Sequence, residues 1–198
     1  LSSKYRYDTI IDMSLTNLLN LIDSIGNLLR SEEKKFLKPL GLLPIHLNVI
    51  NYLSTCNKYS NNPAALTRYL GNTKGTTSQS VNVLEKKGYL IKEKIKDDKR
   101  VVKLYLTDKA TDLLNQLSFE DSESFFNDKS IEVSESVLSN ILKSLQLSNQ
   151  NRTFGVCKTC DFFIDEGDGF RCGLTQEKLF DFEIDQICQE HESELHDF

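Results

Sequence analysis

Five cysteines occur in this 198-residue chain, and four of them lie in its last quarter. These four are spaced C-x2-C-x11-C-x15-C, at positions Cys157, Cys160, Cys172 and Cys188. A C-x2-C pair directs two thiolates of one tight turn at a single ion, and later segments can return the remaining ligands. Four soft ligands in tetrahedral reach are typical of a closed structural zinc site. We therefore expect these four cysteines to bind a metal, with His191 as a reserve ligand.

The residues around the cysteines fit a small metal-dependent module. The stretch FFIDEGDGFRC, residues 162–172, is predicted to form a hairpin with Gly167 and Gly169 at its bend. A segment as short as 154–198 buries little apolar surface, so a metal would supply folding energy that its core lacks. We expect its phenylalanines to pack around the site: Phe154, Phe162, Phe163, Phe170, Phe180 and Phe182.

Three other chemistries compete for the same cysteines. Four thiolates can equally hold an iron–sulfur cluster, which would make the module a redox or iron sensor. A C-x2-C pair can act in thiol exchange, although the βαβ context of thioredoxin-like proteins is absent. Catalytic zinc needs an open coordination position, and the deaminase pattern H-x-E with P-C-x-x-C is missing. Zinc remains the first expectation and an iron–sulfur cluster the alternative.

Composition and charge narrow the class of the whole protein. Hydrophobic residues make up 39% and charged residues 27%, as in ordinary globular proteins, and no run is apolar enough to cross a membrane. LSSKYRYDTI, at the start, lacks the features of a secretory signal, so we expect a cytoplasmic protein in which disulfides are disfavoured. The net charge of −5 is uneven: residues 73–109 carry +5 and residues 154–198 carry −9. A basic middle within an acidic chain indicates a polyanionic partner for that middle.

The basic middle has the pattern of a winged helix-turn-helix. Two short helices are expected, PAALTRYLG after Pro63 and a second one from the cap Thr73 to the terminator Gly88. Two alternating runs, LIKEKIK and VVKLYLT, follow as a hairpin with a charged tip, and Thr107 is expected to cap the next helix. In such a fold the second helix enters the major groove and the hairpin reaches along the backbone. The DNA-binding residues predicted on these elements are Lys74, Thr76, Ser78, Gln79, Asn82, Lys86, Lys99 and Arg100.

Long helices flank this region. Apolar residues recur every three or four positions between Asp8 and Arg30, and their surface is wider than one stripe, so a subunit interface is expected to cover part of it. A last helix, SESVLSNILKSLQL, carries a second apolar face, and a polar linker at 147–153 follows it. Cys56 is in register with Val49 and Leu53, so we interpret it as a buried thiol and not as an oxidant sensor.

The wing resembles that of the multiple-antibiotic-resistance regulator (MarR) family. DDKRVVKLYLTDKA matches the signature of that family at Asp98, Arg100, Leu104, Leu106 and Thr107, with Ala110 in place of the usual Gly. VLEKKGYL, residues 83–90, matches the end of the family's recognition helix, and the resemblance spans roughly residues 8–148.

The resemblance implies a homodimeric regulator that binds a pseudo-palindromic operator. It implies that Arg100 enters the minor groove, that Asp98 orients it, and that the two long helices dimerise. Family members often respond to a small-molecule or redox effector, and nothing in this sequence identifies one.

The predicted fold class is mainly α with a small β-wing: a winged helix-turn-helix with dimerisation helices, plus a cysteine-rich metal-binding module. The predicted domains are residues 1–150 and 154–198. We expect a transcriptional regulator that acts as a repressor, binds double-stranded DNA and is not an enzyme. The alternatives are a winged-helix interaction scaffold and a metalloenzyme in which the last segment does the chemistry.

Overall fold

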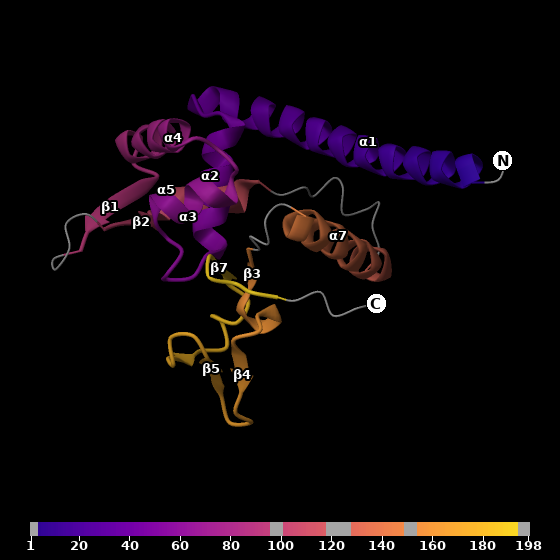
Figure 1. Ribbon diagram of the computed structural model, residues 1–198. Coiled ribbons are helices and arrows are strands. Elements are labelled where there is room, and N and C mark those ends of the chain that lie inside the picture. The colour runs from indigo at the N-terminus through magenta and orange to yellow at the C-terminus, as the bar shows by residue number, and fades with distance from the viewer. Residues whose placement is uncertain (1–3, 96–100, 118–127, 149–153, 194–198) are drawn as a thin grey trace. The chain divides into compact units, whose positions relative to one another are not determined.

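The computed structural model describes residues 4–95, 101–117, 128–148 and 154–193 (Figure 1), and the side chains of residues 14–95, 101–117, 129–146 and 154–193. The chain divides into two compact units, residues 1–47 and 48–198. The winged helix and the cysteine-rich segment thus belong to one unit. That residues 1–150 and residues 154–198 form separate domains remains a prediction.

The first unit is dominated by one long helix, α1, from Lys4 to Leu37. It is longer than the expected span of 8–30, because charged residues after Arg30 continue the helix without an apolar signal. A 3-10 turn, η1 (Lys38–Leu40), follows and ends at Gly41, whose φ of 62° is favourable for glycine. Large apolar side chains of α1 are exposed in the single chain, among them Leu15, Leu21, Ile25, Leu28 and Leu29.

The helix-turn-helix is built from α3 and α4, preceded by α2. Their bounds are Pro44–Thr55 for α2, Pro63–Tyr69 for α3 and Lys74–Lys86 for α4. Asn62 caps α3 by accepting hydrogen bonds from the backbone N–H groups of Ala64 and Ala65, with Pro63 at the first helical position. The expected Thr73 cap and the Gly88 stop of α4 are both present.

The wing is an antiparallel pair of strands, β1 (Leu90–Lys94) and β2 (Val102–Leu106), in which Leu90 faces Leu106. The helix α5 (Asp108–Gln116) follows. Thr107 occupies the N-cap position of α5, as expected, but its side chain makes no capping hydrogen bond, because its hydroxyl donates to the Gly88 carbonyl oxygen at 2.7 Å. The hydroxyl therefore joins the strand end to the turn after α4.

The last long helix, α7, runs from Asp128 to Ser148 and begins earlier than the expected residue 134. Its apolar face is exposed in the single chain, at Ile131, Val133, Val137, Leu138, Leu142 and Leu145. No helix of the described part of the chain is long and apolar enough to span a membrane.

The cysteine-rich segment forms two small antiparallel sheets joined by short turns (Figure 1). One pairs β3 (Gly155–Val156) with β7 (Ile187–Cys188), and the other has the order β4-β5-β6, formed by Phe163–Asp165, Phe170–Cys172 and Lys178–Leu179. The predicted hairpin is confirmed, and Gly167 turns it with a φ of 84°. The packing expected for Phe180 and Phe182 is wrong: both rings are about two thirds exposed and stack on each other.

Candidate DNA interface and cysteine site

One face of α4 is buried and the opposite face is open. The buried positions are Thr77, Ser80, Val81 and Leu84. The six helix residues predicted to contact DNA are all exposed: Lys74, Thr76, Ser78, Gln79, Asn82 and Lys86. The helical period therefore separates a packing face from a polar face, as required of a helix that reads a groove.

Two of those six residues have partners within the protein. The Thr76 and Thr73 hydroxyls are 3.0 Å apart at the start of the helix. Asn82 accepts a hydrogen bond from the Lys92 ammonium, which also forms an ion pair with Glu85 at 2.7 Å. Lys92 on β1 thus ties the wing to α4, and the sequence pattern alone did not indicate this role.

A groove of about 710 Å³ lies between α3, α4 and the wing strands. Its lining includes three cations, Arg68, Lys74 and Lys92, of which only Lys74 was predicted as a DNA contact. The wing-tip predictions, Asp98, Lys99 and Arg100, lie outside the described residues. Their roles remain predictions.

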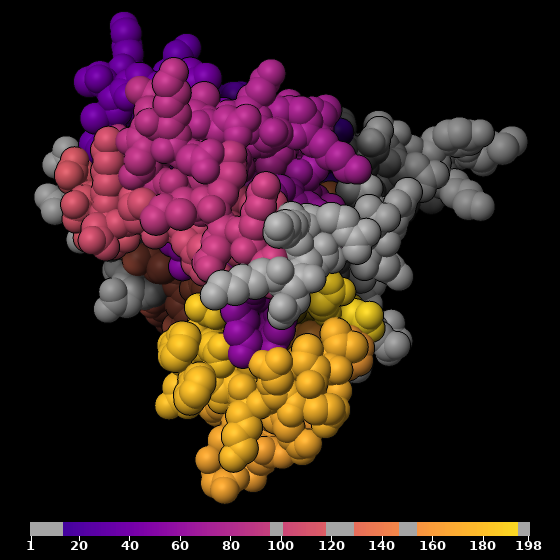
Figure 2. Space-filling model, turned by 90° about the vertical axis from the view of Figure 1, so that its left-hand side faces the viewer, coloured from indigo at the N-terminus to yellow at the C-terminus, as the bar shows by residue number. Residues whose placement is uncertain are grey.

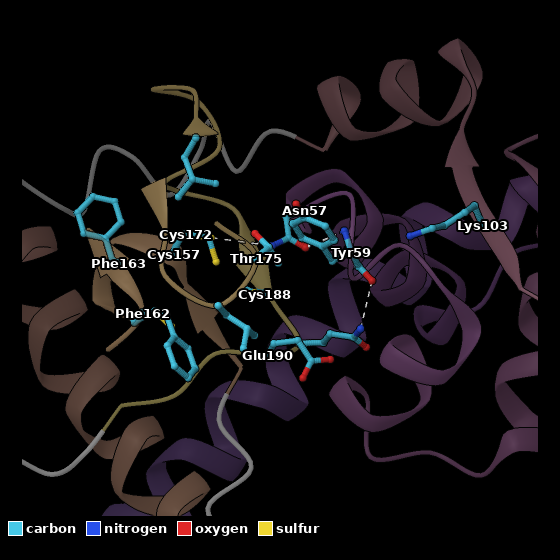
Figure 3. A pocket seen from close by; sticks show the side chains of 14 residues that line it. Asn57, Tyr59, Lys103, Cys157, Phe162, Phe163, Cys172, Thr175, Cys188 and Glu190 are labelled. Atoms are coloured by element: carbon cyan, nitrogen blue, oxygen red, sulfur yellow. Dashed lines mark hydrogen bonds between the residues drawn. The ribbon is translucent and has the colours of Figure 1, made fainter. Parts of the chain in front are cut away.

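The four clustered cysteines line a single cavity of about 260 Å³ (Figure 3). Cys157 begins the 3-10 turn η2 (Cys157–Thr159), and Cys160 directly follows that turn. Cys172 ends β5 and Cys188 ends β7. The apolar part of the lining consists of Phe162, Phe163, Leu174 and Leu179. Three segments of the chain, the η2 turn, β5 and β7, thus bring all four predicted ligands to one apolar cavity.

The thiols of this cavity influence one another. A hydrogen bond between Cys157 and Cys188 raises the pKa of Cys157 and lowers the pKa of Cys188 to about 6. Burial raises the pKa of Cys160, and the neighbouring Cys188 and Cys172 add to that rise. A cation at their centre would relieve this repulsion between thiolates.

The cysteines surround the cavity but do not meet at one point. Among the described residues, no three Cys, His, Asp or Glu side chains stand close enough to hold one metal ion as placed. His191 is not among the residues that line the cavity; its Nε2 lies 3.0 Å from the Thr159 hydroxyl, and its ring is buried. The four thiols suit a soft metal ion or an iron–sulfur cluster, and binding of either one remains a prediction.

The winged helix also contributes to the cavity, through Asn57, Tyr59 and Lys103 (Figure 3). The Nδ2 group of Asn57 donates to the Sγ of Cys157 at 3.9 Å, across 100 residues of sequence. Nothing in the sequence marks these three residues, because their proximity arises from the packing of the last segment on the loop after α2.

The fifth cysteine, Cys56, stands apart as a buried thiol, as predicted. It is 7% exposed, and its Sγ–H group donates to the Leu53 carbonyl oxygen at 3.8 Å. Burial raises its pKa to about 11, which leaves little reactive thiolate at neutral pH.

Comparisons with known proteins bear on the winged helix. A sequence model described as the MarR family matches residues 40–101. A comparison with curated protein sequences gave no significant match. Many solved structures resemble much of the chain, and the three described next are each under 25% identical to it.

A MarR transcriptional regulator from Methanosarcina mazei Go1 is 20% identical, with a TM-score of 0.55, over 67% of this chain and 99% of its own. Streptococcus pneumoniae FabT, solved in complex with DNA, is 22% identical with a TM-score of 0.52, over 67% of this chain and 97% of its own. The S. aureus MepR–DNA complex is 20% identical with a TM-score of 0.52, over 64% of this chain and 96% of its own. About two thirds of the chain therefore has the fold of these MarR-type winged-helix proteins, and the remaining third lies outside the match.

Proposed function

We propose that this protein is a homodimeric, sequence-specific DNA-binding transcriptional regulator that acts as a repressor and has no enzymatic activity. The observation that carries the proposal is the polar, exposed face of α4 above its buried Val81 and Leu84, within a region that matches the MarR family. FabT and MepR, which share the fold, were solved with DNA. On this chain, the side chains of α4 read base edges in a major groove, and Arg68, Lys74 and Lys92 supply positive charge beside it.

The homodimer part of the proposal rests on two exposed apolar faces. Helix α1 exposes Leu21 and Leu28 by more than 60%, and α7 exposes Leu138 and Leu142, one turn apart, by 50% and 56%. Contiguous apolar surface of this kind is unusual on a monomer and is typical of an interface. A second copy of the chain presents the same faces, as a two-fold interface requires.

Binding to duplex DNA at several salt concentrations tests the regulator assignment. The operator is first selected from a random-sequence duplex pool, and its affinity is then measured by fluorescence anisotropy. We expect the affinity to fall steeply with salt, because Lys and Arg release counterions from the phosphates. Absence of sequence-selective, salt-sensitive binding would favour the interaction-scaffold alternative. Operator-dependent loss of transcription in a purified system tests repression.

For the cysteine site we propose a thiolate-bound metal centre with zinc as its first candidate. Cys157, Cys160, Cys172 and Cys188 would hold the ion, which would crosslink segments that have little apolar core of their own. In that role zinc supplies folding energy and no reaction chemistry.

An iron–sulfur cluster is the second candidate, because four thiolates can equally hold one. Four thiolates bound to one zinc at about 2.3 Å stand only about 3.8 Å apart and leave no cavity between them. Here the four cysteines line a space of about 260 Å³ with Phe162 and Phe163 beside it. The same cavity is also lined by Asn57, Tyr59 and Lys103, so the metal content of the protein, and not this volume, decides between the two candidates.

Metal analysis of protein purified without oxygen tests both candidates. One zinc per chain in a colourless sample supports a structural zinc site. Iron and acid-labile sulfide in a brown sample support a cluster. Cys160→Ser should abolish either loading, and unchanged metal content in this variant would show that the ligand set is incorrect.

A further inference from the structure

The cysteine-rich segment is seated on the loop between α2 and α3, residues 56–62, which we call the docking loop. Figure 2 shows the purple surface around the end of α2 meeting the yellow and orange surface of residues 154–193. The backbone N–H of Asn57 donates to the Ile187 carbonyl oxygen at 2.9 Å, and the N–H of Gln189 donates to the Ser60 hydroxyl at 2.8 Å. Both contacts involve residues next to Cys188.

Further contacts widen this interface. The Lys58 ammonium pairs with Glu177 at 2.7 Å and lies 3.7 Å from Glu183. Phe154 packs edge-on against Tyr69 at the end of α3, with a centroid distance of 5.3 Å. The segment therefore holds the docking loop by backbone and charge contacts, and the end of α3 by a ring contact.

Asn57 connects the cysteine site to this loop through the two ends of one side-chain amide. Its Nδ2 group donates to the Cys157 Sγ, and its Oδ1 accepts from the Ser60 hydroxyl at 2.7 Å and from the N–H groups of Tyr59 and Ser60 at 3.1 Å. The side chain is buried, with the residue only 5% exposed. A buried amide satisfied on both sides fixes the loop relative to the sulfur.

The docking loop in turn contacts the wing and α3, which flank the recognition helix α4. Ser60 accepts a hydrogen bond from the Tyr52 hydroxyl at its carbonyl, Asn61 accepts one from the backbone N–H of Leu104 in the wing at 2.8 Å, and Asn62 caps α3. A shift of this loop would therefore move both the wing and the first helix of the helix-turn-helix.

From these contacts we propose that Asn57 is a positioning residue that couples the occupant of the cysteine site to the helix-turn-helix, so that the loaded protein binds its operator more tightly than the stripped protein. The inference rests on the proposed metal centre and DNA binding. Loading fixes Cys157 and Cys188 and thereby the two strands that hold the docking loop. Stripping frees them, and the loop and the α3 cap lose their support. This route differs from one through the dimerisation helices.

The test measures operator affinity for the loaded protein, purified without oxygen, and for the same protein stripped with a chelator under reducing conditions. The ratio of the two affinities is the quantity of interest. Reloading the stripped protein with Zn²⁺, or with Fe²⁺ and sulfide, should restore the affinity of the loaded form. Coupling between two sites typically amounts to about 5–150-fold, and we expect a ratio in that range for the wild type. Asn57→Asp keeps the acceptor oxygen that holds Ser60 but removes the donor to Cys157. In this variant the ratio should fall toward one.

A matched control makes the same chemical change on the exposed side of α2, at Asn51→Asp, and should retain the wild-type ratio. A purely structural defect in Asn57→Asp would lower the affinity of both forms and leave their ratio unchanged, which would overturn the proposal. A wild-type protein that binds no metal, or no operator, would instead refute the proposed function. A wild-type protein that binds metal and operator, but whose loaded form binds the operator no more tightly than its stripped form, would overturn only the coupling.

Hydrogen exchange on the wild type provides a second measurement that needs no variant. Stripping should accelerate exchange in the docking loop and in the first turn of α3, and leave α5 unchanged. Faster exchange confined to residues 154–193 would overturn the proposal.

Discussion

Gly155→Ala tests the metal-linked folding of the last segment without altering a cysteine. Gly155 lies opposite Cys188 in the β3–β7 pair, and the His191 ring covers its α-carbon. A methyl group there would stand 2.5 Å from the His191 Nε2 and 2.7 Å from its Cε1. Such distances are far inside van der Waals contact, so the ring or the strand must move.

The cost is set by how firmly the ring is held. His191 is 8% exposed, and its Nε2 is within 3.0 Å of the Thr159 hydroxyl. Overpacking at a site of this kind costs about 1–3 kcal/mol. If metal binding and folding of the segment are one process, that cost appears as weaker metal binding by about 5- to 150-fold.

Competition with a chelator of known affinity, under reducing conditions, measures this change. Gly169→Ala is the matched control, because a methyl group there meets no atom within 4 Å and the residue has no left-handed φ; its metal affinity should be unchanged. Adding His191→Ala to Gly155→Ala should restore part of the loss. Unchanged affinity in Gly155→Ala alone would refute the link between folding and metal.

Three further outcomes are expected. Lys74→Ala should weaken binding by a similar factor on all duplexes and lower the salt slope by about one, in anisotropy titrations, if this exposed lysine contacts a phosphate; an unchanged slope contradicts that contact. Leu21→Glu puts a charge on an exposed apolar face of α1 and should shift sedimentation toward monomer, whereas an unchanged dimer would exclude that face. Burial raises the pKa of Cys56 to about 11, so at pH 8 it should react with iodoacetamide about 100-fold more slowly than a thiol with a pKa of 9.0. Mass spectrometry measures the labelling, and rapid labelling of Cys56 in the folded protein would contradict its burial.

Local sequence signals predicted most elements of the winged helix. The cap at Thr73, the stop at Gly88 and the alternation in the two wing strands each act within a few residues, so their structural effects could be inferred directly. The hairpin around Gly167 was predictable for the same reason.

Other features could not be predicted from the sequence, because they depend on tertiary packing or on which of several acceptors a hydroxyl group bonds to. Thr107 has the sequence of a helix cap, yet its hydroxyl finds the Gly88 carbonyl across the turn. Phe180 and Phe182 have the composition of a core, but the short loop that carries them leaves both rings exposed. Asn57 and Cys157 are 100 residues apart, and no local pattern predicts their contact.

The place where the cysteine-rich segment docks bears on how it could act. A metal site on α4 itself would occupy the helix surface that is proposed to contact DNA. The docking loop lies instead between α2, α3 and the wing, where Asn61 bonds to Leu104 and Asn62 starts a helix. The segment also carries a charge of −9, which opposes phosphate, while the ion pair of Lys58 with Glu177 offsets part of it at the interface. If the protein binds the proposed metal and DNA, loss of the metal would remove support from the loop and release acidic chain near the helix-turn-helix, and both effects would lower DNA affinity.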